Sequence, residues 1–73
     1  MKISEIRQMR NRAPFRPFQI HLVSGEVLPV QHPEQMSLPE DEKELFVVWT
    51  ARDWNLIEAS QVAQLSVPRK SAK

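Results

Sequence analysis

Residues 14–34 read PFRPFQIHLVSGEVLPVQHPE, and this stretch decides the fold. In its first half, apolar residues alternate with more polar ones, and the apolar set is Phe18, Ile20 and Leu22. Because successive side chains of a strand point to opposite faces of a sheet, this period of two predicts a half-buried β-strand. Gly25, the only glycine of the chain, follows where the backbone must reverse. Since glycine accepts a positive φ without steric cost, we expect it in the turn of a β-hairpin.

The second half of the stretch predicts the returning strand of this hairpin. Leu28, Val30 and His32 share one face, and Pro29 belongs to the other. Proline has no N–H to donate to a neighbouring strand, so we expect Pro29 at an edge of the sheet or at a bulge. Beyond the hairpin, residues 33–44 contain two prolines and an acidic run, which predicts a surface loop, with Met36 and Leu38 as candidates to extend a strand before it.

A short helix and three more extended segments complete the chain. Ile3, Ile6 and Met9 recur every three to four residues, which predicts an amphipathic helix over about residues 3–12. β-Branched and aromatic residues, separated by turns, predict further strands at residues 45–50, 54–58 and 62–67.

One helix followed by about five short strands predicts a mainly β domain, and this element order is similar to that of SH3-like and Sm-like barrels. We expect a five-stranded antiparallel barrel at about residues 15–67, within a single small domain that spans residues 1–68. Residues 69–73 would form a disordered basic tail. The inward positions of the alternating segments predict the core, which is Ile20, Leu22, Leu28, Val30, Val47, Leu56 and Leu65.

The hairpin stretch also resembles a known group of sequences. The pattern PFxPFxIxLxxG at residues 14–25, followed by VxHPE at residues 30–34, is similar to that of a widespread group of short bacterial proteins with no assigned function. The resemblance covers residues 14 to about 67, and it implies a bacterial origin and one complete domain. Where that group often has aspartate before the turn glycine, this chain has Ser24, which also suits a turn. The resemblance implies no activity.

Composition limits the compartment and the classes of site. The 73 residues include no cysteine, which excludes disulfides and thiolate metal sites and fits a reducing compartment. The longest apolar runs fall short of the roughly 18 residues that a membrane-spanning helix needs. The N-terminal residues turn polar before any apolar core of a signal peptide appears. We therefore expect a cytoplasmic protein that engages no membrane.

The formal net charge of +1 conceals an uneven distribution. Residues 1–16 carry a net charge of +4, residues 17–68 carry −6 and residues 69–73 carry +3. One interpretation is that solvated basic termini flank an acidic domain, and the other is a basic strip for nucleic acid. Because the acidic run at residues 40–44 would repel a polyanion, we expect weak, non-specific binding at most. The strip would consist of Arg7, Arg10, Arg12 and Arg16, with Arg69 and Lys70 of the tail.

His21 and His32 are the only histidines, and with Glu34 they would make a His₂Glu set suited to zinc. Their spacing matches no standard zinc signature. The alternative is that His21 faces solvent while His32 hydrogen-bonds the turn around Pro33. No serine lies in a nucleophile elbow, and a single glycine cannot form a phosphate-binding loop. We therefore expect no metal, no cofactor and no catalysis, and a metal protein or enzyme using these three residues is the third-ranked alternative.

Trp49 and Trp54 flank the short turn that contains Arg52. Aromatic side chains beside an arginine can stack on bases or grip a peptide, but the favoured expectation is that at least one tryptophan packs in the core. The favoured interpretation is a non-enzymatic binding or assembly module for a protein partner. The runner-up is an Sm-like RNA-binding protein, although residues 61–63 lack the glycine that this group usually has before the last strand.

A second copy of the chain is one expected protein partner, because a small domain with a short helix could bury Ile3 and Ile6 by self-association. The candidate binding surface as a whole is Arg7, Arg10, Arg12, Arg16, His32, Glu34, Trp49, Arg52 and Trp54.

Overall fold

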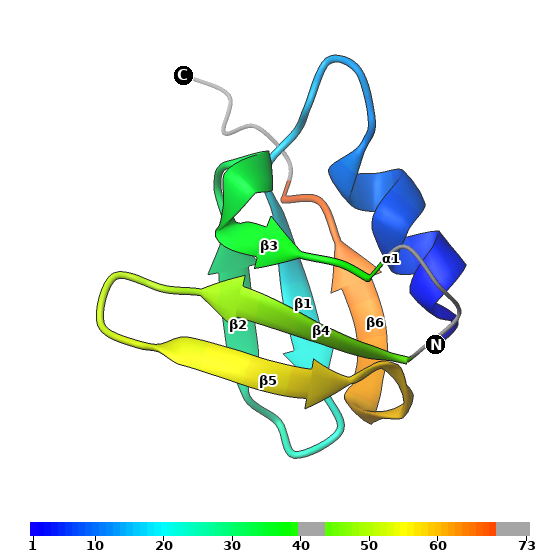
Figure 1. The fold of residues 1–73 in the computed structure, drawn as a ribbon, viewed down its shortest axis with the longest axis vertical. Helices are drawn as coiled ribbons and strands as arrows, with labels where there is room; N and C mark the ends of the chain where they lie inside the picture. Colours follow the sequence, from blue (N-terminus) through cyan, green and yellow to red (C-terminus); the bar gives the residue numbers. More distant parts are fainter. Residues whose placement is uncertain (40–43, 69–73) are drawn as a thin grey trace.

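The computed structural model describes residues 1–39 and 44–68, and in these residues one short helix and six strands form two three-stranded sheets (Figure 1). The first sheet has the order β2-β1-β6 and consists of β1 (Phe18–Leu22), β2 (Val27–Val30) and β6 (Val62–Ser66). The second sheet has the order β3-β4-β5 and consists of β3 (Met36–Ser37), β4 (Leu45–Trp49) and β5 (Trp54–Glu58). The remaining elements are the helix α1 (Ile3–Arg10) and two 3₁₀ turns, η1 (Pro33–Gln35) and η2 (Ala59–Gln61).

The hairpin predicted from residues 14–34 is present as β1 and β2. Ile20 lies opposite Leu28, and both side chains are buried as expected. Gly25 has a φ of +99° in the turn between the two strands, which confirms its predicted role. Pro29 is exposed on β2, an edge strand of the first sheet, so its missing N–H breaks no ladder.

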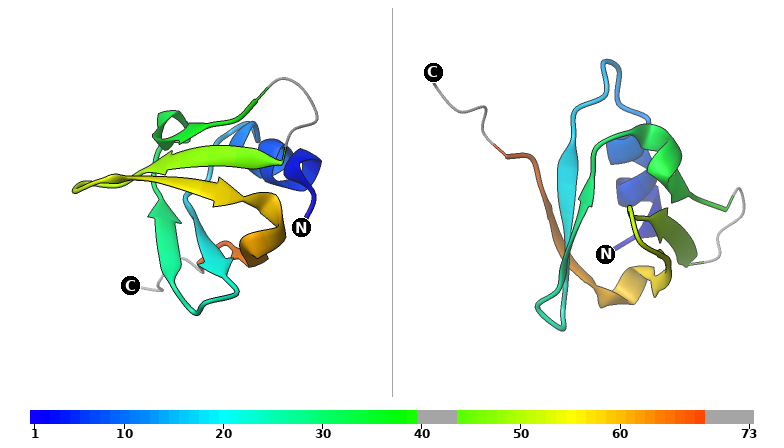
Figure 2. Two further views of the ribbon diagram at one scale, coloured as in Figure 1. Left: turned by 60° about the horizontal axis from the view of Figure 1, so that its bottom comes forward. Right: turned by 90° about the vertical axis from the view of Figure 1, so that its left-hand side faces the viewer.

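The second sheet crosses the first at a steep angle, and the two sheets pack face to face (Figures 1 and 2). β4 and β5 form the tight hairpin predicted from residues 45–58, and β3 pairs with β4 on its other side. The tip of the β4–β5 hairpin projects beyond the first sheet, on the side opposite α1 (Figure 2). The hairpin therefore presents one face to the core and the other to solvent.

The core lies between the two sheets and α1. Ile3 and Ile6 are buried in it, which overturns the expectation that they bury against a second copy. Leu22 and Leu65, which we expected in the core, are half-buried and pack against it. The largest fully buried side chains are Phe18, Phe46, Ile6, Ile20, Val30 and Val48.

Two predicted core residues lie on the solvent side of the second sheet. Val47 is half-buried and Leu56 is exposed, because Phe46, Val48 and Ile57 are the side chains that point inward from β4 and β5. A shift of one residue moves every side chain of a strand to the other face. The predicted alternation is present in both strands, but its predicted phase is wrong.

The prediction of a closed five-stranded barrel is also wrong. β5 lies at the edge of the second sheet, so that sheet does not close on itself. The sixth strand is β3, in which Met36 is buried opposite Val48. It includes Met36 of the predicted strand extension but not Leu38, within the loop expected over residues 33–44. Residues 40–43 of that loop, and the predicted basic tail at 69–73, lie outside the described residues.

Candidate protein-binding face

β4 and β5 carry large apolar side chains on the side of the second sheet that faces away from the core. This outer face consists of Leu45, Val47, Trp49, Trp54 and Leu56. Val47 lies opposite Leu56, and Trp49 lies opposite Trp54, so the five side chains form one stripe along two paired strands. Trp54 is 64% exposed and Trp49 is 45% exposed. The expectation that at least one tryptophan packs in the core is therefore wrong.

Side-chain hydrogen bonds shape the turn at the tip of the β4–β5 hairpin. Thr50 Oγ1 donates to Asp53 Oδ1 at 2.7 Å, and the backbone N–H of Asp53 donates back to Thr50 Oγ1 at 3.2 Å. The backbone N–H of Thr50 donates to the carbonyl oxygen of Asp53 at 2.8 Å. These bonds give the backbone a turn without glycine, and they support the register that places the two tryptophans side by side.

Charged residues of opposite sign lie near the two ends of the outer face. Arg52 is exposed at the tip, beside the tryptophans, and the carboxylate of its neighbour Asp53 is engaged by Thr50. Glu58 is exposed at the other end of β5, opposite Leu45, and exposed Glu44 directly precedes β4 there. The stripe therefore has an exposed arginine near one end and carboxylates at the other.

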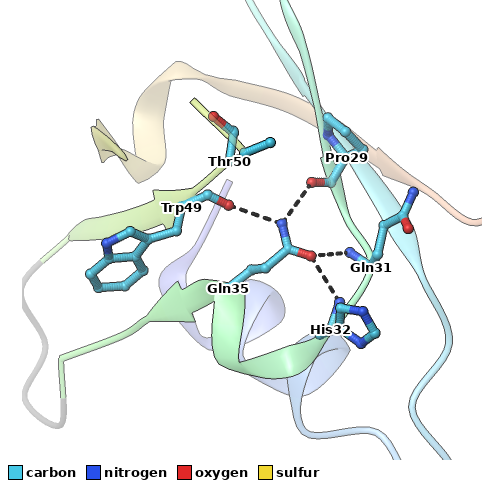
Figure 3. Close-up of a pocket in the computed structure, with 7 residues that line it drawn as sticks. Pro29, Gln31, His32, Gln35, Trp49 and Thr50 are labelled. Carbon is cyan, nitrogen blue, oxygen red and sulfur yellow. Dashed lines mark hydrogen bonds between the residues drawn. The ribbon is translucent and has the colours of Figure 1, made fainter. Parts of the chain in front are cut away.

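An open pocket of about 490 Å³ adjoins the outer face at Trp49 (Figure 3). Gln35 of η1 lies at its centre and makes four hydrogen bonds. Its Nε2 donates to the carbonyl oxygens of Trp49 at 2.9 Å and Pro29 at 3.4 Å. Its Oε1 accepts from the backbone N–H groups of Gln31 at 2.7 Å and His32 at 3.0 Å. The lining residues are Pro29, Gln31, His32, Gln35, Trp49, Thr50 and Ala51.

The Gln35 amide joins the two sheets, because its bonds reach from the end of β2 to the end of β4 (Figure 3). An amide has two donor hydrogens and two acceptor lone pairs, so all four positions are in use. Gln35 therefore holds the structure together and offers no free polar group to a ligand. The predicted binding surface does not include Gln35, although a glutamine three residues after His32, with a proline at the first helical position, is a signal for the start of a short helix.

The predicted basic strip divides into two kinds of arginine. Arg7 Nη2 donates to the carbonyl oxygen of Pro39 at 2.5 Å, and Arg10 Nη1 donates to that of Met36 at 3.3 Å. Both side chains are half-buried and tie α1 to β3 and the segment that follows it. Arg12 and Arg16 are exposed. The tail members of the strip, Arg69 and Lys70, lie outside the described residues, so no continuous strip can be drawn.

The structure does not bring the proposed zinc ligands together. His21 lies opposite Val27, near the turn of the first hairpin, and its Nε2 is 2.8 Å from Ser66 Oγ. His32 follows the far end of β2, and Glu34 is exposed on η1. At about 3.3 Å per residue, the separation along the hairpin exceeds 10 Å. Within residues 1–39 and 44–68, no three His, Cys, Asp or Glu side chains are grouped to hold a metal ion.

Comparisons of the chain with protein-family models, curated proteins and solved structures found no match. In the part of the chain that the structure describes, no helix is long and apolar enough to cross a membrane. A function can therefore be inferred only from the chemistry of the residues themselves, and the outer face is their most distinctive arrangement.

Proposed function

We propose that this chain is a non-enzymatic binding module that engages a protein partner through the outer face of the second sheet. The observation that supports it is the stripe of five large apolar side chains in register on β4 and β5. Contiguous exposed apolar surface is disfavoured in water, and on stable proteins it commonly marks an interaction site. Exposed tryptophan adds to this, because Trp is enriched among the residues that dominate binding energy.

The outer side of the first sheet provides an internal reference. There β1 presents Gln19 and His21, whose neighbours are Ser66 and Gln64 on β6 and Pro29 and exposed Val27 on β2. The first sheet thus exposes mostly polar side chains with one aliphatic residue, whereas the second sheet exposes five large apolar ones. The difference supports a role in binding for the second sheet.

Our proposal also includes a relationship to SH3-like and Sm-like domains and to the group of short bacterial proteins described above. The element order of helix, bent hairpin, tight hairpin, 3₁₀ turn and final strand supports a relationship to SH3-like and Sm-like domains. The pattern in residues 14–34 supports a place among the short bacterial proteins that it resembles. Neither relationship supplies an activity, since small β domains of this type carry many unrelated functions.

Capture of partners from a lysate of the source organism tests the proposal, with the full chain as bait. Leu56→Glu places a charge in the middle of the outer face, and we expect it to abolish capture of the specific partner. Val23→Glu is the matched control, because Val23 is also 61% exposed but lies in the turn between β1 and β2. Equal capture by wild type, Leu56→Glu and Val23→Glu would exclude the outer face.

A nuclease arm of the same experiment separates protein from RNA partners. The RNA alternative rests on the exposed pair Trp49 and Trp54 beside Arg52, which could act as a stacking platform. We expect capture to survive nuclease treatment. Capture that is lost with nuclease, and that weakens steeply with salt, would favour the Sm-like RNA-binding alternative.

A further inference from the structure

We infer that the partner seated on the outer face is a second copy of this chain, packed face to face across a twofold axis. The inference rests on the proposed function and names the occupant of the same surface. The twofold axis would lie between the two second sheets and run across their strands. In this arrangement the tip of each β4–β5 hairpin covers the opposite end of its partner's hairpin.

The charges at the two ends of the outer face favour the orientation in which the strands of the two copies run in opposite directions. With the strands reversed, Arg52 at the tip of one copy approaches Glu58 and Glu44 of the other, and the twofold axis repeats the contact. With the strands parallel, the two ends that carry Glu44 and Glu58 would instead lie together, and so would the two tips that carry Arg52. The surface is therefore complementary to itself in one orientation and repulsive in the other.

The apolar side chains match in the same orientation. Val47 and Leu56, the middle pair of the stripe, would lie at the twofold axis against their own copies. Because the axis runs across the strands, β4 would lie over β4 and β5 over β5, so Trp49 of one copy would cover Leu45 of the other and Trp54 would pack over the methylene groups of Glu58. Every large apolar side chain of the outer face would then leave water, which no contact within one copy achieves.

The size of the face predicts how strong the dimer is. The five side chains expose roughly 500 Å² per copy, so the dimer would bury about 1,000 Å² in total, near the lower limit for a specific interface. Interfaces of this size are commonly transient. We therefore expect weak, reversible dimerisation that is detected only in the upper part of a concentration series.

Sedimentation equilibrium between about 1 µM and 1 mM tests the inference together with intrinsic fluorescence. Trp49 and Trp54 are the only tryptophans, and both lie on the outer face, so their emission should shift to the blue as the dimer forms. We expect Leu56→Glu to remain monomeric at 1 mM and Val23→Glu to dimerise like wild type. Circular dichroism and a thermal melt of each variant confirm that it is folded.

A charge exchange tests the orientation. Arg52→Glu and Glu58→Arg each place like charges together and should raise the dissociation constant about fivefold or more. The double variant Arg52→Glu/Glu58→Arg restores opposite charges across the interface and should return to within about twofold of wild type. Failure of the double variant to recover would overturn the tip-over-end arrangement.

Two results would overturn the dimer itself. One is a monomer at 1 mM, and the other is a dimer that forms without any change in tryptophan emission. The proposed function can survive either result, because Leu56→Glu would still lose capture of a different protein from the lysate. If that variant keeps both its partner and its self-association, the outer face has no binding role at all.

Discussion

The two sheets of this domain differ in what they present to water. On the first sheet, β1 alternates buried Phe18 and Ile20 with Gln19 and His21 on the outer side. On the second sheet, both sides of β4 are apolar, and the residues that face out are as hydrophobic as those that face in. Folding requires one apolar face per sheet, so the second apolar face of β4 and β5 calls for a different explanation, and binding supplies one.

The same difference decides what the amino-acid sequence can predict. A period of two identifies a strand, but only polar residues on one side identify which side faces the core. In β1 the phase follows directly from Gln19 and His21. In the run Leu45–Trp49 every residue is apolar, so either face could be the buried one, and the pattern wrongly predicts Val47 in the core in place of its neighbours Phe46 and Val48.

The largest expected effect tests this difference within β5. Leu56 and Ile57 are neighbours in the chain and have side chains of the same composition, yet Leu56 is 61% exposed and Ile57 is 6% exposed. We expect Ile57→Ala to lower the free energy of unfolding by about 2–4 kcal/mol, because it leaves a cavity between the sheets. Leu56→Ala should change it by less than about 1 kcal/mol. Urea denaturation of both variants at low micromolar concentration, where the monomer prevails, gives the comparison.

The reverse order, with Leu56→Ala the more damaging variant, would place the core on the other side of β4 and β5. It would also restore the original expectation that Leu56 is a core residue. Equal, large losses would mean that both faces are buried in solution, which a dimer persisting at that concentration would produce.

Local patterns predict the helix, the first hairpin and the strands at residues 45–50 and 54–58, because propensity and turn chemistry act over a few residues. Contacts between distant segments were not predictable in this way. Arg7 was assigned to a basic strip, but it binds the carbonyl oxygen of Pro39, 32 residues away. The four bonds of Gln35 likewise depend on how η1 lies between the sheets, which a single sequence does not specify.

The next effect in size concerns this link between the two sheets. Gln35→Glu keeps the oxygen that accepts from Gln31 and His32, but it replaces the donor to Trp49 and Pro29 by an oxygen that faces two carbonyl groups. We expect a loss of about 1–3 kcal/mol in the free energy of unfolding.

Gln64→Glu is the matched control for the Gln35 variant, because it makes the same chemical change on an exposed residue of β6. That control should stay within about 0.5 kcal/mol of wild type in a urea melt. If the two variants are equally stable, the Gln35 amide does not join the sheets in solution, and the packing of the core alone holds the two sheets together.

The smallest expected effect compares the two hairpin turns. The turn of the second sheet uses Thr50 and Asp53 side chains, whereas the turn of the first sheet uses the positive φ of Gly25. A Cβ added at Gly25 would meet no atom within 4 Å, so Gly25→Ala would suffer only backbone strain, with a cost of about 1–2 kcal/mol. Ser24→Ala, at the preceding position, should cost less than about 0.5 kcal/mol, and thermal melts of the two variants measure the difference. An unchanged melting temperature for Gly25→Ala would show that this turn relaxes to a negative φ, so that β1 and β2 keep their register through core contacts and not through the turn.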